Sequence, residues 1–227
     1  MIPWKQIDTA GVPGAKVELR LMQRGAEFSM KIGQNELMNS RLSGSEEALA
    51  TLACRRLEAV KAPHLLIGGL GMGFTLRAAL AVLGPKARIT VAELVPAVID
   101  WARGPMAGIF GDSLVDPRAS VLCADVIEVI QSKPSAFDAV LLDVDNGPEG
   151  LIRKANDALY DPGGLKAIRR ALRPGGVLAV WSSGPHPAFS KRLRDAGFEV
   201  NEVAVRATTR RSGARHLIWF ATKSDAL

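Results

Sequence analysis

The N-terminal part of the chain alternates apolar and polar residues along two short runs. Residues 17–21 (VELRL) and 28–32 (FSMKI) place every second side chain on one face, with Arg24 and Gly25 between the runs. A period of two residues predicts strands, and a glycine-containing connection predicts a hairpin. We therefore expect a short N-terminal β-hairpin region over residues 1–36, followed by a second unit over residues 37–227.

The next run has helical spacing. Apolar residues in SEEALATLACRRLEAV (45–60) recur three or four positions apart, which predicts a helix. Ser45 can cap its amino end, and Glu46 and Glu47 lie in the first turn, where the helix dipole favours negative charge.

From residue 64 onward, short apolar runs alternate with helix-like segments. We predict strands over 64–69, 87–94, 119–125, 137–145 and 176–183, and helices over 74–84, 96–103, 126–132, 164–172 and 187–197. This alternation predicts a parallel sheet with helices on both faces. Two final strands, 198–207 and 216–223, are joined by a loop too short for a helix and should form an antiparallel edge hairpin. The expected fold is α/β, with a doubly wound, seven-stranded, mostly parallel sheet.

Composition is that of an ordinary soluble globular protein, with 227 residues, 48% apolar and 23% charged. Much of the net charge of +6 lies in the last third of the chain, in residues Lys191, Arg192, Arg194, Arg206, Arg210, Arg211 and Arg215. A nucleic-acid surface is one interpretation. We favour a solvated surface, because no aromatic residues interleave with these charges to stack on bases.

Other sequence features narrow the class of protein. The opening residues lack the charged-then-apolar pattern of a secretory leader. The apolar stretch 64–84 contains five glycines and Arg77, so it is not expected to span a membrane. We expect Cys54 and Cys123 to be buried free thiols in a reducing, cytoplasmic compartment. Three scattered histidines give no metal-ligand spacing, so we expect no metal site.

A glycine-rich loop follows the first parallel strand, where ligands bind in open parallel sheets. Gly69, Gly71 and Gly73 allow backbone to come close to a ligand. A dinucleotide fingerprint, G-x-G-x-x-G, would need glycine at position 74, where Phe74 stands. The spacing therefore favours a nucleoside without a pyrophosphate.

Acidic residues follow the next three strands. Glu93 lies at the distance from the glycine loop at which an acid reaches ribose hydroxyls, and Asp125 can accept from a base amino group. Asp143 and Asp145 follow the fourth strand and precede the turn residues 146–148. Asp125 could instead cap a helix, and Asp143 or Asp145 could stabilise that turn. Since one glycine loop and three acidic strand ends occur in a row, we predict a nucleoside-binding cleft.

Residues 37–223 resemble the spermidine synthase group within the class I S-adenosylmethionine-dependent transferase fold. The resemblance is carried by LLIGGLGMGFTLRAAL, ITVAELVPAVIDWAR, DPRASVLCADVIEVI, FDAVLLDVDNGP and LKAIRRALRPGGVLAVWSS, and ELMNSRLSGSEEALATLA is also similar. It implies decarboxylated S-adenosylmethionine, or S-adenosylmethionine itself, as the group donor. It also implies a small-molecule amine acceptor and a homodimer.

The resemblance further implies a role for each strand-end residue. Gly69, Gly71 and Gly73 would approach the nucleoside, Glu93 would hold the ribose, and Asp125 would hold the adenine amino group. Asp143 matches the acid that assists the attacking amine, with Asp145 as a second catalytic candidate. A carboxylate can take the proton of an amine, whose free lone pair is needed to attack a sulfonium carbon.

The chain also departs from the family pattern on the amine side of the site. Met72 stands where the family has an aspartate, Asn146 replaces a second aspartate of the catalytic turn, and SEEALATLA (45–53) lacks the family's tyrosine–histidine pair. The only tyrosine is Tyr160, and the N-terminal strand region is shorter than usual.

Several functions fit these observations. We favour an aminopropyltransferase acting on a polyamine-type amine. The alternatives are a methyltransferase on the same fold with another acceptor, and a non-catalytic nucleoside- or RNA-binding module. A nicotinamide oxidoreductase is disfavoured by Phe74 and by the antiparallel terminal hairpin.

Overall fold

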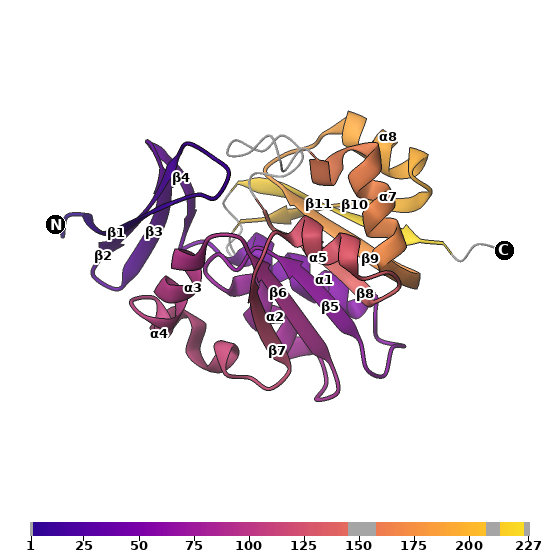
Figure 1. Ribbon diagram of the computed structural model, residues 1–227, viewed down its shortest axis with the longest axis horizontal. Helices are drawn as coiled ribbons and strands as arrows, with labels where there is room; N and C mark the ends of the chain where they lie inside the picture. Colours follow the sequence, from indigo (N-terminus) through magenta and orange to yellow (C-terminus); the bar gives the residue numbers. More distant parts are fainter. Residues whose placement is uncertain (1, 145–157, 208–213, 225–227) are drawn as a thin grey trace.

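The computed structural model describes residues 2–144, 158–207 and 214–224, which form two sheets with helices packed around the larger one (Figure 1). The smaller sheet is antiparallel, in the order β1-β2-β3-β4. Its strands are β1 (Lys5–Gly11), β2 (Glu18–Arg24), β3 (Glu27–Ile32) and β4 (Asn35–Asn39).

The N-terminal hairpin predicted from the alternation is the β2–β3 pair, which turns at Gly25 with φ +59°. The structure adds β1 and β4 on either side. Most β1 residues are exposed, so this edge strand carries no alternation that the sequence could show. β4 crosses residue 36, and the division of the chain at that residue stays a prediction.

The larger sheet has seven strands in the order β10-β11-β9-β8-β5-β6-β7. They are β5 (His64–Gly68), β6 (Arg88–Glu93), β7 (Ala119–Cys123), β8 (Phe137–Leu142), β9 (Leu172–Ser182), β10 (Phe198–Arg206) and β11 (Arg215–Lys223). β5 to β9 pair in parallel, whereas β10 and β11 form an antiparallel hairpin at one edge. The predicted fold class is confirmed.

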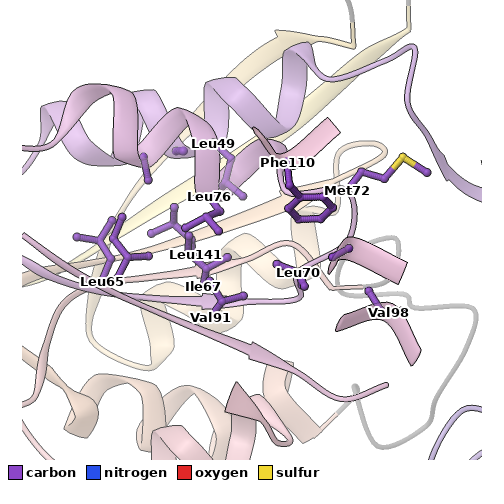
Figure 2. Close-up of a cluster of buried hydrophobic side chains, with 14 of the residues drawn as sticks. Leu49, Leu65, Ile67, Leu70, Met72, Leu76, Val91, Val98, Phe110 and Leu141 are labelled. Carbon is purple, nitrogen blue, oxygen red and sulfur yellow. The ribbon is translucent and has the colours of Figure 1, made fainter. Parts of the chain in front are cut away.

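Helices cover both faces of this sheet. They are α1 (Gly44–Arg55), α2 (Phe74–Val82), α3 (Pro96–Arg103), α4 (Ala107–Phe110), the 3₁₀ helix η1 (Gly111–Leu114), α5 (Val126–Ser132), α7 (Pro162–Ala171) and α8 (Pro187–Asp195). α1, α2 and α3 pack on one face, in a core shared with the N-terminal sheet, and α5, α7 and α8 pack on the other. Neighbouring strand residues alternate between these cores: Leu65 and Ile67 point into the first, drawn in Figure 2, and Leu66 into the second.

Two local expectations are wrong. α1 begins one residue before Ser45, and its N-cap is Ser43, so the Ser45 hydroxyl does not cap the helix. Cys54 is buried, but Cys123 is exposed, because β7 is an edge strand of the sheet. Neither cysteine forms a disulfide.

β9 begins at Leu172, four residues earlier than the predicted strand 176–183. Phe137 of β8 pairs with Leu172, and Ala139 pairs with Val177, so four residues of β9 bulge out between these two pairs. They are the arginine, proline and two glycines of residues 173–176. Among the described residues, no helix is both long and apolar enough to cross a membrane.

Candidate functional site

The carboxyl ends of β5, β6, β7 and β8 meet along one rim of the larger sheet. Gly69, Glu93, Asp125 and Asp143 all line a single cavity at this rim. The sequence predicted this meeting, since neighbouring parallel strands end at the same edge. Asp145 lies outside the described residues.

The three loop glycines play different structural parts. All have positive φ: +89° at Gly69, +50° at Gly71 and +76° at Gly73. A Cβ at Gly69 would lie 2.7 Å from the carbonyl oxygen of Asp143, and one at Gly71 would lie 2.9 Å from Cε of Met38. Gly69 and Gly71 therefore bring bare backbone to the cavity wall.

Gly73 faces the protein interior instead. A Cβ there would collide with the ring of Phe110, which lies beside the loop in Figure 2. Gly73 is also the N-cap of α2 and is absent from the cavity lining. The predicted role of Gly73 beside a nucleoside stays a prediction. In the structure, the absence of a side chain at Gly73 allows α2 to pack closely against Phe110.

Glu93 is the last residue of β6 and is 7% exposed. Its Oε2 accepts from Leu70 N–H and its Oε1 from Val95 N–H, both at 2.9 Å. Burial raises the pKa of Glu93, against the lowering effect of these backbone donors. The backbone N–H groups of Gly71 and Leu94 also lower the pKa of Glu93, so its carboxylate is held in place by four neighbouring backbone donors.

Asp125 fulfils the capping alternative while also lining the cavity. It is the N-cap of α5, and its Oδ1 accepts from Ile127 N–H at 3.1 Å. Capping of α5 and a place on the cavity wall are compatible, because the same side chain does both.

Asp143 follows β8 at the centre of the rim. Its Oδ2 accepts from the hydroxyl of Thr75 at 2.9 Å, and the same hydroxyl lies 3.5 Å from the carbonyl oxygen of Glu46. Protein atoms surround the carboxyl group, although part of the residue is accessible from the cavity. Burial, reinforced by the negative charge of Glu46, raises the pKa of Asp143 to about 7, against the lowering effect of Thr75.

Glu46 lies in the first turn of α1, and sequence reasoning missed its proximity to Asp143. Its Oε2 accepts from the hydroxyl of Ser45 at 2.6 Å, and that hydroxyl lies 2.9 Å from Nδ1 of His216 in β11. Burial is the main cause that raises the pKa of Glu46. Two neighbouring carboxyl groups of raised pKa hold protons at a pH where ordinary carboxylates have lost them.

The opposite wall of the cavity comes from the N-terminal sheet and its first connection, and it is entirely apolar. Its members are Val12, Leu19, Met30, Ile32, Leu37 and Met38. The sequence predicted a hairpin here but not its place over the rim. The alternation of VELRL and FSMKI did indicate that one face of the hairpin is apolar. An apolar face is normally covered by another part of the protein, and here it covers the rim cavity.

No cluster of three or more potential metal ligands occurs among the described residues. Among the described residues, the acids on the cavity wall are Glu93, Asp125 and Asp143, and Glu46 lies near Asp143 outside the lining. This arrangement can accept hydrogen bonds from hydroxyl or amino groups and can take up a proton near neutral pH.

The strand order, the helices on both faces and the glycine loop define a Rossmann-like α/β class. The chain belongs to the spermine/spermidine synthase family, because the model of the spermine/spermidine synthase domain matches residues 46–195.

Curated relatives agree with this assignment. The chain is 31% identical over 157 residues to polyamine aminopropyltransferase 1 of Streptomyces coelicolor, covering 65% of this chain and 29% of that protein. It is 31% identical over 148 residues to polyamine aminopropyltransferase 2 of Pseudomonas aeruginosa, covering 60% and 40% respectively. The chain therefore matches well under half the length of these relatives.

Solved structures show the same fold. A spermidine synthase in complex with the transition-state analogue AdoDATO superposes with a TM-score of 0.74 at 20% identity, covering 97% of this chain and 73% of the other. The spermidine synthase from Thermotoga maritima superposes with a TM-score of 0.74 at 17% identity, covering 98% and 74%.

Proposed function

We propose that this protein transfers an aminopropyl group from decarboxylated S-adenosylmethionine to a polyamine-type amine. Membership of the spermine/spermidine synthase family supports the reaction, and it disfavours the methyltransferase and the binding module. The observation that carries the proposal is Asp143, a carboxyl group with a pKa raised to about 7 on the wall of the rim cavity.

The described residues fit such a donor. Gly69 and Gly71 present backbone where a Cβ would be crowded, and the carboxyl groups of Glu93 and Asp125 line the same cavity, where ribose hydroxyls and an adenine amino group would need acceptors. The bound donor supplies a carbon made electrophilic by the adjacent sulfonium. The apolar wall around Met38 excludes water from this side, which strengthens electrostatic interactions in the cavity.

Asp143 acts on the acceptor amine. An amine is mostly protonated near neutral pH, and it can attack only after it loses a proton. A carboxyl group with a pKa near 7 is poised to accept that proton at Oδ1 or Oδ2, and Thr75 fixes its orientation through the 2.9 Å hydrogen bond. Glu46 keeps the pKa of Asp143 high, and its charge also favours a cationic amine. We keep Asp145 as a second catalytic candidate.

The cavity of about 150 Å³ is smaller than typical ligand pockets of about 300–1,000 Å³. Donor binding therefore requires the two walls to open further. Met38, which packs over Gly71, has the flexible, unbranched side chain best suited to move aside.

We also propose a cytoplasmic homodimer. Free cysteines, one of them exposed, suit a reducing compartment. β1 and β4 are open edges of the N-terminal sheet, and such edges can pair with a second copy of the chain. Analytical ultracentrifugation should give twice the monomer mass, and a monomer at every concentration would contradict the dimer.

The reaction is tested by its by-product. We expect purified protein, incubated with decarboxylated S-adenosylmethionine and putrescine, to release methylthioadenosine in step with a longer polyamine. A parallel incubation with S-adenosylmethionine should release no S-adenosylhomocysteine. Formation of S-adenosylhomocysteine, or of neither product with any of several diamines and triamines, would overturn the proposal.

A further inference from the structure

A second and larger cavity lies on the seven-stranded sheet's other side from the rim cavity, near the amino ends of the parallel strands. Its volume is about 880 Å³, and α7, α8 and the end of β11 line it. Lys223 is the last residue of β11, and its neighbour Thr222 pairs with Val177 in the early part of β9. The cavity therefore lies near the amino ends of the parallel strands, away from Glu93 and Asp143 at their carboxyl ends.

The lining of this cavity is strongly basic. Lys166, Arg169 and Arg170 come from α7, Arg192 from α8 and Lys223 from β11. Among the described lining residues, the only acid is Asp195. Its carboxylate is already paired, with Oδ2 at 2.7 Å from Nζ of Lys191.

Two of these arginines have unused donors. Nε of Arg169 and Nε of Arg192 are buried and have no hydrogen-bond partner within the part of the chain that the structure describes. Buried polar groups nearly always have a partner, so an unpaired one points to a missing ligand, ion or water. An arginine Nε–H also costs free energy when it is left unsatisfied.

The cations also repel one another. The pKa of Lys223 is lowered, first by burial and then by the positive charge of Arg169. Nζ of Lys223 donates one hydrogen bond to the carbonyl oxygen of Leu172 at 2.6 Å. An anion in the cavity would relieve this repulsion.

We propose that this cavity binds a compact anion carrying two or more phosphate groups. Guanidinium groups match phosphate oxygens with two parallel hydrogen bonds, and the cavity volume is that of a small-molecule site.

The surrounding surface disfavours nucleic acid as the ligand. Lys191 pairs with Asp195, and Arg194 lies 3.7 Å from Glu202, so the flanking cations of α8 are balanced. On α8, therefore, the cation without an acidic partner among the described residues is the one that lines the cavity, Arg192, and the helix offers no unbalanced strip that could follow a phosphate backbone. No aromatic residue is among the described lining, so a base-stacking platform is missing there.

Isothermal titration of the full chain with tripolyphosphate, at constant ionic strength, tests the proposal. We expect saturable binding, and we expect R169Q/R192Q to weaken it by about a hundredfold or more, since two cations that face the anion are removed. The matched control is K61Q/K86Q, which removes two exposed cations elsewhere and should change the affinity less than about twofold. Arg169 is partly buried, so its replacement could also disturb folding. K166Q/R170Q changes two exposed cations of the same cavity and provides a second test. The thermal midpoint of each variant shows whether it is folded.

Three results would overturn the proposal. One is the absence of tripolyphosphate binding to the wild-type chain. Another is an equal loss of affinity in the cavity and control variants, which indicates only non-specific attraction. The third is tighter binding of a single-stranded RNA oligonucleotide, lost in the same cavity variants, which would assign the surface to nucleic acid. D143N should bind tripolyphosphate like the wild type, so this test is independent of the proposed transferase activity.

Discussion

Asp143 and Glu46 lie far apart in the sequence, yet the negative charge of Glu46 affects the titration of Asp143. Asp143 follows β8, Glu46 lies in the first turn of α1, and Thr75 is close to both through one hydroxyl. Burial disfavours the charged form of both acids, and the charge of Glu46 further disfavours ionisation of Asp143. The result is a carboxyl group whose pKa is raised to about 7.

Replacing Glu46 should move the pH dependence of turnover. Without that negative charge, the pKa of Asp143 falls, so its base form is populated at lower pH. We expect the acidic limb of kcat against pH to shift down by about one unit in Glu46→Gln, which is within the range that a nearby charge produces. Glu58→Gln, at the exposed end of the same segment, is the matched control. An unshifted limb in Glu46→Gln would show that Glu46 does not influence the titration that limits turnover.

At the scale of elements, the glycine loop and α2 depend on one close contact. Gly73 has φ +76° and faces the ring of Phe110, so a methyl group at this position meets both backbone strain and a collision. Thr75 lies in the first turn of α2, and its hydroxyl orients Asp143. The packing of Gly73 thus sets the position of a group in the site.

Gly73→Ala should therefore lower both stability and turnover. Overpacking and left-handed strain together cost about 2–4 kcal/mol, which corresponds to a fall in Tm of roughly 5–15 °C for a chain of this size. Gly84→Ala is the control, since Gly84 has open space around its Cα and no positive φ. Thermal unfolding followed by circular dichroism measures the difference. Equal midpoints for the two variants would contradict this account of the contact.

Elements with strong periodicity were predictable from the sequence. The bounds of α3 and α5 match the prediction residue by residue, because Pro96 at the start of α3 and the Asp125 cap of α5 mark their first turns. β1 was not predictable, because a mostly exposed edge strand has no apolar face. β4, with the sequence NELMN, is also too polar and too short to stand out.

One part of the candidate site could be predicted from the sequence, and another part could not. The places of Glu93, Asp125 and Asp143 on one rim follow from the parallel order of the strands, which the alternation of strands and helices reveals. The approach of Glu46 to Asp143 depends on how α1 packs against α2 and β8. Such a contact between distant residues is set by tertiary packing and leaves no mark in local periodicity.

At the scale of the whole molecule, the cavity exists because the N-terminal sheet packs over the rim. Figure 1 shows this small sheet beside α3, at one end of the larger one. A hydrogen bond of 2.6 Å joins the two parts, from Trp101 Nε1–H in α3 to Oδ2 of Asp8 in β1. This donation, followed by one from Thr9 N–H, lowers the pKa of Asp8.

Removing this link should loosen the cavity wall. Asp8→Leu deletes the acceptor and leaves the indole N–H of the buried Trp101 without it, whereas Asp8→Asn keeps a carbonyl oxygen in the same place. We expect Asp8→Leu to raise the KM for the donor several-fold with little change in kcat, and Asp8→Asn to remain near the wild type. Identical kinetics for the two variants would show that this hydrogen bond does not hold the wall.

The pKa of Asp8 is lower in the folded than in the unfolded chain. The stabilisation from the Asp8 carboxylate is therefore present above its unfolded pKa and is lost as pH falls through its folded pKa.

The role of Asp143 is the central claim, and single-turnover kinetics test it most directly. With saturating decarboxylated S-adenosylmethionine and putrescine, the rate of aminopropyl transfer should rise with pH and level off above about 7, where Asp143 becomes a base. Asp143→Asn should lose this dependence and react about 10²–10⁴-fold more slowly, while its donor affinity in calorimetry stays within about twofold of the wild type. A variant that keeps the wild-type rate and pH profile, or that loses donor binding instead, would contradict the claim.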